Sequence, residues 1–302
     1  MKLFAGIDGG QSSTIALVAD ERRRVLGRGI SGACDYIGQS ADSVRFARAL
    51  ESAVAAALRA ADLPADSEFA AVVAGISGYE GKIVGVEPHL KSSRVHYLHD
   101  AKIAHAACFG DGPGIIVIAG TGSVALGRNE RGEEATVGGW GFLFGDEGSA
   151  FATARAALAH AMQAQDAGLD TTLARRATEF FERPDLRTIA HDFYVNRIER
   201  SKVASFATVV FELSDGGDEA ATGIVRDAAR SLADLAATCA QRLQLTGAGT
   251  AVSLAGGTFA SESFLGLVSS NIRERMPRAK VAKAADEPVT GALLLAYKEA
   301  AE

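Results

Sequence analysis

The sequence predicts an α/β protein built from two similar halves. Its 302 residues exceed one ordinary compact domain and suit two. Short apolar runs alternate with segments of helical periodicity, which is typical of α/β proteins with mixed sheets. The order strand, glycine turn, strand, charged turn, strand occurs twice, over residues 3–30 and 115–138. We therefore expect two related halves that face each other across a cleft.

The first half is predicted to begin with three strands and to continue with alternating helices and strands. Its strand assignments follow apolar runs bounded by glycine or charged turns, and its helices follow alanine, leucine and arginine at helical spacing. In chain order we expect strands at Leu3–Ile7, Ile15–Ala19 and Val25–Ile30, a helix at Ser43–Ala61, strands at Phe69–Gly75 and Arg94–Leu98, and a helix at Lys102–Phe109.

The second half repeats the three strands and then becomes mostly helical. We expect strands at Ile115–Ala119, Val124–Gly127 and Ala135–Gly138, helices at Ser149–Ala167, Thr171–Phe181, Asp185–Ser201 and Asp218–Gln244, a strand at Ala251–Leu254, and helices at Glu262–Arg275 and Glu287–Ala301. A hinge near Gly110–Gly114 divides the chain into domains at 1–112 and 113–286.

Composition favours a globular cytoplasmic protein. Hydrophobic residues make up 48% and charged residues 23% of the chain, and the net charge of −6 comes without a long basic run, which argues against nucleic acid binding. The three cysteines, Cys34, Cys108 and Cys239, show no CxxC spacing, so no disulfide framework or metal signature is expected. Apolar runs are too short to span a membrane, and a strand starting at Leu3 leaves no room for a signal peptide.

Two glycine–hydroxyl turns predict phosphate binding. Each follows the first strand of its half, DGGQSST in the first and GTGS in the second. Backbone N–H groups and hydroxyls in such turns suit the β- and γ-phosphates of ATP, with Mg²⁺ offsetting charge and Asp8 orienting the hydrated ion. The alternatives are two ordinary β-hairpins, or a dinucleotide fingerprint, although a strand rather than a helix follows Gly120–Ala125. The residues assigned to ATP here are Asp8, Gly10, Ser12, Ser13, Thr14, Gly120, Thr121, Gly122 and Ser123.

Asp100 lies between a predicted strand and a predicted helix. Aspartate is a preferred helix N-cap, which would explain the residue without catalysis. A carboxylate at a strand end also suits a general base that accepts a proton from an attacking hydroxyl in phosphoryl transfer. Both roles are compatible.

The segments GGWG and GDEGSA are the most unusual in the chain. In the simpler interpretation Trp140 belongs to the core and Asp146 caps the following helix. In the functional one, the backbone of Gly139–Gly141 and the Asp146 carboxylate bind a polyhydroxylated substrate such as a sugar.

These motifs together resemble the BadF/BadG/BcrA/BcrD ATPase family, and in particular its N-acetylglucosamine kinases. DGGQSST, GTGS, GGWG with GDEGSA, and LAGG carry the resemblance, which spans nearly the whole chain and is thinnest over Ala164–Gly247. It implies two ribonuclease-H-like domains of the actin-like ATPase type, with a C-terminal helix at 287–302 completing the first domain. It also implies ATP and Mg²⁺, phosphoryl transfer to the 6-hydroxyl of an amino sugar, and a homodimer.

The resemblance also implies roles for individual residues. Ser12 and Thr121 would contact ATP phosphates, Gly256 and Gly257 would pass close to the nucleotide, and Asp100 would be the catalytic base. The sugar site would contain Gly139, Trp140, Gly141 and Asp146.

Two departures and three alternatives remain. Gln11 and Ser12 stand where the family usually has glycine and threonine. The sugar loop of the family's animal kinases has an asparagine and a tryptophan after the third strand, where this chain has Gly32–Tyr36, and either Asp35 or Tyr36 would take the polar role. An acid in that loop favours a free amine, which makes glucosamine the competing substrate. An ATPase that activates a dehydratase would need cluster-binding cysteines that the pattern lacks. A sugar-sensing repressor would need an added helix-turn-helix.

Overall fold

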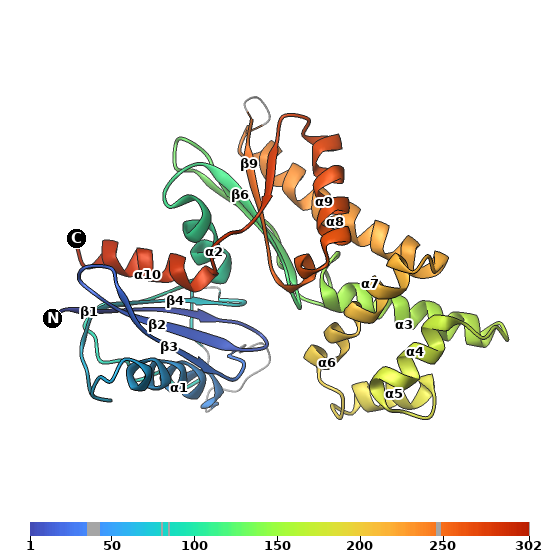
Figure 1. Ribbon diagram of the computed structural model, residues 1–302, viewed down its shortest axis with the longest axis horizontal. Coiled ribbons are helices and arrows are strands. Elements are labelled where there is room, and N and C mark those ends of the chain that lie inside the picture. The colour runs from blue at the N-terminus through green and yellow to red at the C-terminus, as the bar shows by residue number, and fades with distance from the viewer. Residues whose placement is uncertain (35–42, 80, 84, 246–248, 302) are drawn as a thin grey trace. The chain divides into compact units, whose positions relative to one another are not determined.

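The computed structural model describes residues 1–34, 43–79, 81–83, 85–245 and 249–301, and divides into two compact units (Figure 1). Unit 1 contains Met1–Pro113 and Ala284–Glu302, and unit 2 contains Gly114–Lys283. The corresponding domain boundaries were predicted at 112/113 and 286/287. The predicted α/β class is confirmed, because each unit holds one mixed five-stranded sheet with helices.

The sheet of unit 1 has the strand order β3-β2-β1-β4-β5. Strand β2 runs antiparallel to both of its neighbours, whereas β4 is parallel to β1 and to β5. The carboxyl ends of β1, β3, β4 and β5 therefore share one edge of the sheet. The strands are β1 (Leu3–Gly9), β2 (Thr14–Asp20), β3 (Val25–Ser31), β4 (Phe69–Ile76) and β5 (Val95–His99).

Helices cover both faces of this sheet (Figure 1). Helix α1 (Arg45–Ala60) packs on one face, where Gly29 lets it approach β3 so closely that a Cβ would lie 2.0 Å from the Ala53 carbonyl oxygen. Helices α2 (Asp100–Phe109) and α10 (Pro288–Glu299) pack on the other face. Two separate apolar cores result, one beneath α1 and one beneath α2 and α10.

Unit 2 repeats this topology. Its order β10-β9-β6-β7-β8 places an antiparallel meander beside two parallel strands, as in unit 1. The predicted duplication is thus confirmed at the level of strand order. The strands are β6 (Gly114–Ala119), β7 (Ser123–Arg128), β8 (Glu134–Gly138), β9 (Ala251–Ala255) and β10 (Lys280–Lys283).

The rest of unit 2 is helical, and its large core includes residues from most of its helices. The helices are α3 (Ala150–Asp166), α4 (Thr172–Phe181), α5 (Leu186–Tyr194), α6 (Arg200–Ser205), α7 (Ala207–Asp215), α8 (Glu219–Arg242), the short 3₁₀ helix η1 (Gly257–Ala260) and α9 (Glu262–Arg275).

One predicted element of unit 2 is wrong, and two of its elements were not predicted. The single helix expected over Asp185–Ser201 is wrong, because α5 ends at Tyr194 and Asn196 adopts a left-handed conformation with φ 56° before α6 begins. Helix α7 was missed. Strand β10 was also missed, since it is only four residues long and its lysines give it the polar character of a protected edge.

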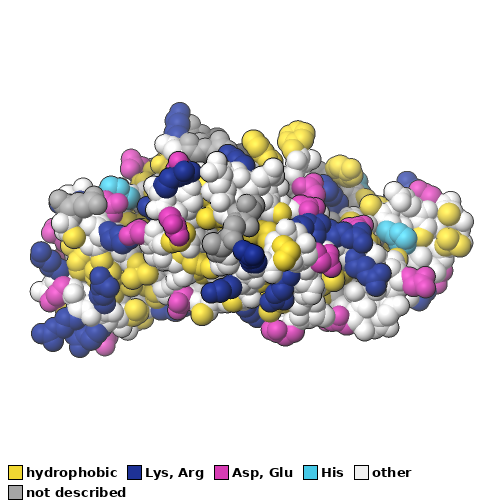
Figure 2. Space-filling model, turned by 90° about the horizontal axis from the view of Figure 1, so that it is seen from above, with side chains coloured by type: hydrophobic (Ala, Val, Ile, Leu, Met, Phe, Trp, Pro, Cys, Tyr) yellow, Lys and Arg dark blue, Asp and Glu magenta, His cyan; other side chains and the backbone are white. Residues whose placement is uncertain are grey.

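The distribution of surface charge agrees with a sequence that has no long basic run. On the face seen in Figure 2, basic and acidic side chains lie interspersed. Among the described residues, no helix combines the length and apolar character that a membrane span requires.

Candidate active site

Two carboxylates of unit 1 lie at the carboxyl edge of its sheet. Asp8 in β1 is paired with Gly75 in β4, and Gly75 is paired with Leu98 in β5. Asp100 follows two residues beyond Leu98, as the first residue of α2. The topology thus brings together two residues that the sequence placed 92 positions apart.

The surroundings of Asp8 oppose its ionisation. Burial raises the pKa of Asp8 from 3.8 to about 7, and the negative charges of Asp100 and Glu287 add to the shift. Glu287 immediately precedes α10 and itself pairs with Arg28. The negative charges of Asp100 and Glu287 therefore disfavour the ionised form of Asp8, but no three acidic, histidine or cysteine side chains among the described residues form a group that could hold a metal ion.

Asp100 is not the helix cap that the simpler interpretation expected. The cap of α2 is His99, whose Nδ1 accepts a hydrogen bond from the Ala101 amide at 3.1 Å. An Nδ1 that accepts this bond carries no proton to donate, although Oδ1 of Asp100 lies only 2.8 Å away. Oδ1 of Asp100 is buried and receives no hydrogen bond from the described residues. Oδ1 is thus an unused acceptor shielded from solvent, whereas the Asp100 side chain as a whole is 22% exposed.

The first glycine turn is tightly braced from within unit 1. The Gly10 amide donates to the Ser13 carbonyl at 2.9 Å, and the Cys34 amide donates to the Gly10 carbonyl at 3.0 Å. Thr14 is buried, and its hydroxyl donates to the Gly32 carbonyl at 2.8 Å. Ser12 is exposed. Of the predicted phosphate ligands in this turn, Ser12 is the more accessible hydroxyl and Thr14 instead stabilises the turn.

The second glycine turn lies at the corresponding edge of unit 2. Ile118 in β6 is paired with Ala255 in β9, so the segments that follow the two strands, at Gly120 and Gly257, lie level with each other. A Cβ added at either glycine would meet no atom within 4 Å. Their backbones consequently border open space that a ligand can occupy.

Gly256 connects β9 to this edge in a conformation that requires glycine. Its φ is 112°, and a Cβ would lie 2.3 Å from the Ala119 carbonyl oxygen. The hydroxyl of Thr258 donates to that same oxygen at 2.7 Å. These contacts fix the LAGG turn against the end of β6.

Asp146 is bound to the second glycine turn rather than to a helix end. Its Oδ1 accepts the Ser123 amide at 3.3 Å, and a Cβ on Gly122 would lie 2.8 Å from its Oδ2. Burial raises the pKa of Asp146, whereas the Ser123 amide and the positive charge of Arg200 oppose that shift. The expected capping role is wrong, because Ser149 caps α3 through the Ala152 amide at 3.1 Å. The Ser123 hydroxyl is also used internally, since it donates to the Glu147 carbonyl at 2.8 Å.

The interpretation of Trp140 as a core residue is wrong as well. Its side chain is 78% exposed, and Leu143 and Phe144 of the same loop are 69% and 86% exposed. Gly141 closes the loop by accepting the Gly145 amide at 2.8 Å. The apolar ring of Trp140 is thus presented to solvent beside the Gly139–Gly141 backbone.

Sequence reasoning missed the residues that hold this loop in place. Phe142 packs against Phe151 with ring centroids 5.3 Å apart, and the guanidinium of Arg200 lies 5.1 Å from the Phe142 ring. Arg155 donates to the Phe142 carbonyl at 3.1 Å. Both arginines lie in a region that the sequence marked only as helical, and no motif distinguished them. The predicted sugar-loop residues Asp35 and Tyr36 lie outside the described residues.

Comparison with known proteins identifies the family. The model of the BadF/BadG/BcrA/BcrD ATPase family matches residues 5–296. The chain belongs to this family. The resemblance inferred from the motifs is therefore confirmed. The family match covers both glycine turns, Asp100, and the GGWG and GDEGSA segments.

Several known proteins are similar to this chain over nearly its full length. An N-acetylmuramic acid/N-acetylglucosamine kinase of Clostridium acetobutylicum is 27% identical over 99% of this chain and 99% of its own length. An N-acetyl-D-glucosamine kinase of Dictyostelium discoideum is 27% identical over 98% of both chains. The crystal structure of an N-acetylglucosamine kinase candidate from Chromobacterium violaceum has a TM-score of 0.80 and 23% identity, covering 98% of this chain and 99% of its own. That likeness supports the predicted actin-like ATPase fold.

Proposed function

We propose that this member of the BadF/BadG/BcrA/BcrD ATPase family phosphorylates an amino sugar with ATP, and that N-acetylglucosamine 6-phosphate is its product. The observation that carries the proposal is full-length similarity to two amino sugar kinases. The two carboxylates at the carboxyl edge of unit 1 supply residue types that this chemistry needs.

ATP and Mg²⁺ fit the residues present. The raised pKa of Asp8 reflects burial first and then the negative charges of Asp100 and Glu287, which a nearby cation would offset. Mg²⁺ is usually held by substrate phosphates, waters and one or two carboxylates, so Asp8 would hold it through water. Within unit 2, the open backbone at Gly120 and Gly257 would bind phosphate oxygens. Within unit 1, the exposed hydroxyl of Ser12 is the proposed phosphate ligand. The bound metal would neutralise charge on the transferring phosphoryl group.

Asp100 is the proposed general base. Its side chain is 22% exposed at the carboxyl edge, and the carboxylate would take the proton of the sugar 6-hydroxyl as that oxygen attacks the γ-phosphorus of ATP. His99 holds the start of α2 in place through its cap, which positions the Asp100 backbone.

The sugar site is proposed to contain the backbone of Gly139 and Gly141, the Trp140 ring, and the Asp146 carboxylate. Trp140 offers an exposed apolar surface for a sugar ring, and Asp146 is already held by the Ser123 amide. Asp35 and Tyr36 remain the proposed residues of the sugar loop.

Two competing functions lead to different outcomes in one assay. Glucosamine is the closest competitor as substrate, because Asp35 favours a free amine. A dehydratase-activating ATPase is disfavoured because Cys34 and Cys239 are fully buried.

The proposal also includes a cytoplasmic homodimer, which sedimentation of the full chain would check.

The test is ADP release coupled to a colour reaction, with N-acetylglucosamine, glucosamine, N-acetylmannosamine, N-acetylmuramate and glucose as acceptors. We expect stimulation by N-acetylglucosamine, and nuclear magnetic resonance of the product should show phosphate on the 6-oxygen. Basal ATP hydrolysis that no sugar stimulates would overturn the proposal and favour the activator class.

A further inference from the structure

One ring nitrogen of His99 lies within hydrogen-bond distance of two different groups. Nδ1 is 3.1 Å from the Ala101 amide nitrogen and 2.8 Å from Oδ1 of Asp100. The amide donates, so it needs the lone pair of an unprotonated Nδ1, whereas a carboxylate oxygen accepts and needs a proton on Nδ1. Capping of α2 and a hydrogen bond to Asp100 therefore require different protonation states of His99.

The contact between His99 and Asp100 favours a proton between them. Its separation of 2.8 Å is typical of a hydrogen bond that involves a charged group. While Nδ1 caps α2, its lone pair faces Oδ1, which receives no hydrogen bond from the described residues. Two electron-rich atoms at this distance repel each other, and a bound proton would convert the repulsion into a hydrogen bond.

The geometry also gives the Asp100 carboxylate an inner and an outer side. The side chains of His99 and Asp100 are 27% and 22% exposed, but Oδ1 is buried. The exposed part of Asp100 therefore belongs to its other atoms, at the carboxyl edge of the sheet. A substrate hydroxyl would reach the carboxylate from this outer side, while His99 acts on it from the inner side.

The charges closest to the pair favour its protonated form. Strand β5 packs against β4, which contains no titratable side chain, and against α2. The negative charge of Asp8 in β1 acts on Asp100, and a like charge favours protonation. Lys102 of α2 has the opposite sign, but its side chain is exposed, so solvent and salt screen its charge. The remaining titratable side chains of α2 are His105 and Cys108.

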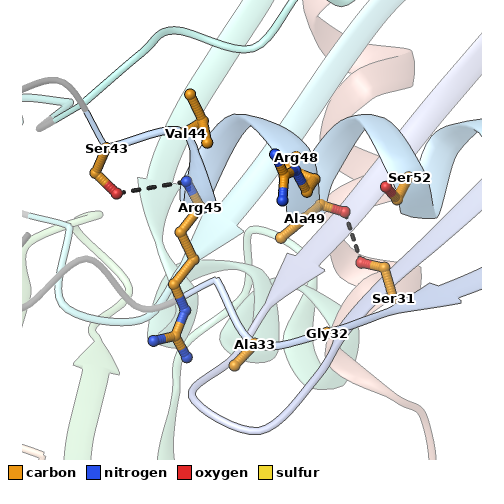
Figure 3. A pocket seen from close by; sticks show the side chains of 9 residues that line it. All are labelled: Ser31, Gly32, Ala33, Ser43, Val44, Arg45, Arg48, Ala49 and Ser52. Carbon is orange, nitrogen blue, oxygen red and sulfur yellow. Dashed lines mark hydrogen bonds between the residues drawn. The ribbon is translucent and has the colours of Figure 1, made fainter.

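The charges further away differ between the two faces of the sheet. Glu287 precedes α10 on the face that α2 covers, and it is paired with Arg28. Arg45 and Arg48 of α1 line a cavity of about 620 Å³ on the opposite face (Figure 3). The sheet thus separates these two arginines from the start of α2.

We propose that His99 is a positioning residue that controls the general base: His99 and Asp100 bind one proton between Nδ1 and Oδ1, and the base is active only when that proton is absent. The proton comes from solvent as the pH falls. Nδ1 then donates to Oδ1, which makes the carboxylate a weaker acceptor for the proton of the sugar hydroxyl. Nδ1 also ceases to cap α2, so the Asp100 backbone loses its anchor. The inference rests on the amino sugar kinase function for its reaction, whereas the shared proton is a property of this pair alone.

The experiment measures kcat between about pH 5 and about pH 9 for the full-length wild type, His99→Asn, His99→Ala and the control His96→Asn. Asparagine is a good N-cap that cannot bind the shared proton, and alanine removes the cap as well. His96 is a matched control because it lies in the same strand and its Nε2 is 3.1 Å from a carboxylate oxygen of Glu299. ATP, Mg²⁺ and the most stimulating sugar are saturating, so that kcat reports groups of the substrate complex.

In the wild type, kcat should fall on the acidic side of neutrality as the pair binds its proton. His99→Asn should move this fall to lower pH by at least about one pH unit, while its kcat at about pH 8 stays within about threefold of the wild-type value. His99→Ala should show the same displacement with a lower kcat at every pH, and His96→Asn should match the wild type. A fall that stays at the wild-type pH in His99→Asn, or that moves equally in His96→Asn, would overturn the inference.

Nuclear magnetic resonance of the histidine ring nitrogens tests the pair without turnover. The signals of His99 are assigned by their absence in His99→Asn. Nδ1 of His99 should gain its proton at a lower pH in Asp100→Asn than in the wild type, because a neutral amide attracts the proton less than a carboxylate does. Equal titration of His99 in both proteins would overturn the inference and leave the proposed function intact. If no sugar stimulates ADP release, the proposed function fails, and this titration still decides whether the pair shares a proton.

Discussion

Replacing Asp8 by asparagine should stabilise the protein at neutral pH while removing a group proposed to be needed for activity. The pKa of Asp8 is raised from 3.8 to about 7 by burial and by the charges of Asp100 and Glu287. The pKa of Asp8 in the folded protein lies above its value in the unfolded chain. The favourable contribution of Asp8 to folding stability is therefore fully present below pH 3.8. It is lost as the pH rises through about 7, and the full shift corresponds to about 4 kcal/mol. Asparagine carries no charge and avoids this loss.

The measurement is urea unfolding of wild type, Asp8→Asn and the control Asp66→Asn from pH 4 to pH 8, without nucleotide or Mg²⁺. The advantage of Asp8→Asn should grow by about 1.4 kcal/mol per pH unit between pH 4 and 7 and then level off. Asp66 is a suitable control because its side chain is 79% exposed. A difference that does not change with pH, or an Asp8→Asn variant less stable than wild type at pH 8, would refute the reasoning.

Three further substitutions test the candidate site. Asp100→Asn should lower kcat about 10²–10⁴-fold in the ADP-release assay with little change in ATP affinity by calorimetry, and near-native turnover would contradict its role as base. Gly256→Ala should cost about 2–3 kcal/mol in urea unfolding, since its φ is 112° and a Cβ would lie 2.3 Å from a backbone oxygen of β6. Gly257→Ala is the matched control, because its Cβ meets no atom within 4 Å. Arg200→Gln should raise KM for the sugar severalfold. It should also move the acidic limb of the pH profile of kcat/KM to higher pH, because the positive charge of Arg200 opposes the rise in the pKa of Asp146. An unchanged pH profile would show that Arg200 does not act through Asp146.

The fold was predictable because its signals are local and repeated. Apolar runs bounded by glycine or charged turns define each meander, and the same order in both halves predicts the same strand order. Asn196 shows where the local pattern is too weak to predict the structure. Asparagine tolerates the left-handed conformation that separates α5 from α6 at this residue, but the apolar pattern around it does not indicate that the helix ends there.

The site was predictable in its residue types but less so in their contacts. The preference of aspartate for helix N-caps predicts that Asp100 and Asp146 cap α2 and α3, yet the capping residues are His99 and Ser149. A capping residue is chosen by the backbone geometry one position before the helix, and a sequence does not fix that position to one residue. Arg200 could not be found at all, because its contact with the GGWG loop arises from tertiary packing alone.

The two charged groups at the edge of unit 1 are kept apart by the sheet. Asp8 faces the side of α10, where Asp100 and Glu287 add negative charge, whereas Arg45 and Arg48 line a cavity on the side of α1. If the arginines lay on the same face of the sheet as Asp8, they would pair with it and lower its pKa. No cation contributes to the raised pKa of Asp8. The buried Asp8 carboxyl opposes folding stability once it ionises, and departures of this kind concentrate where a protein binds its ligands.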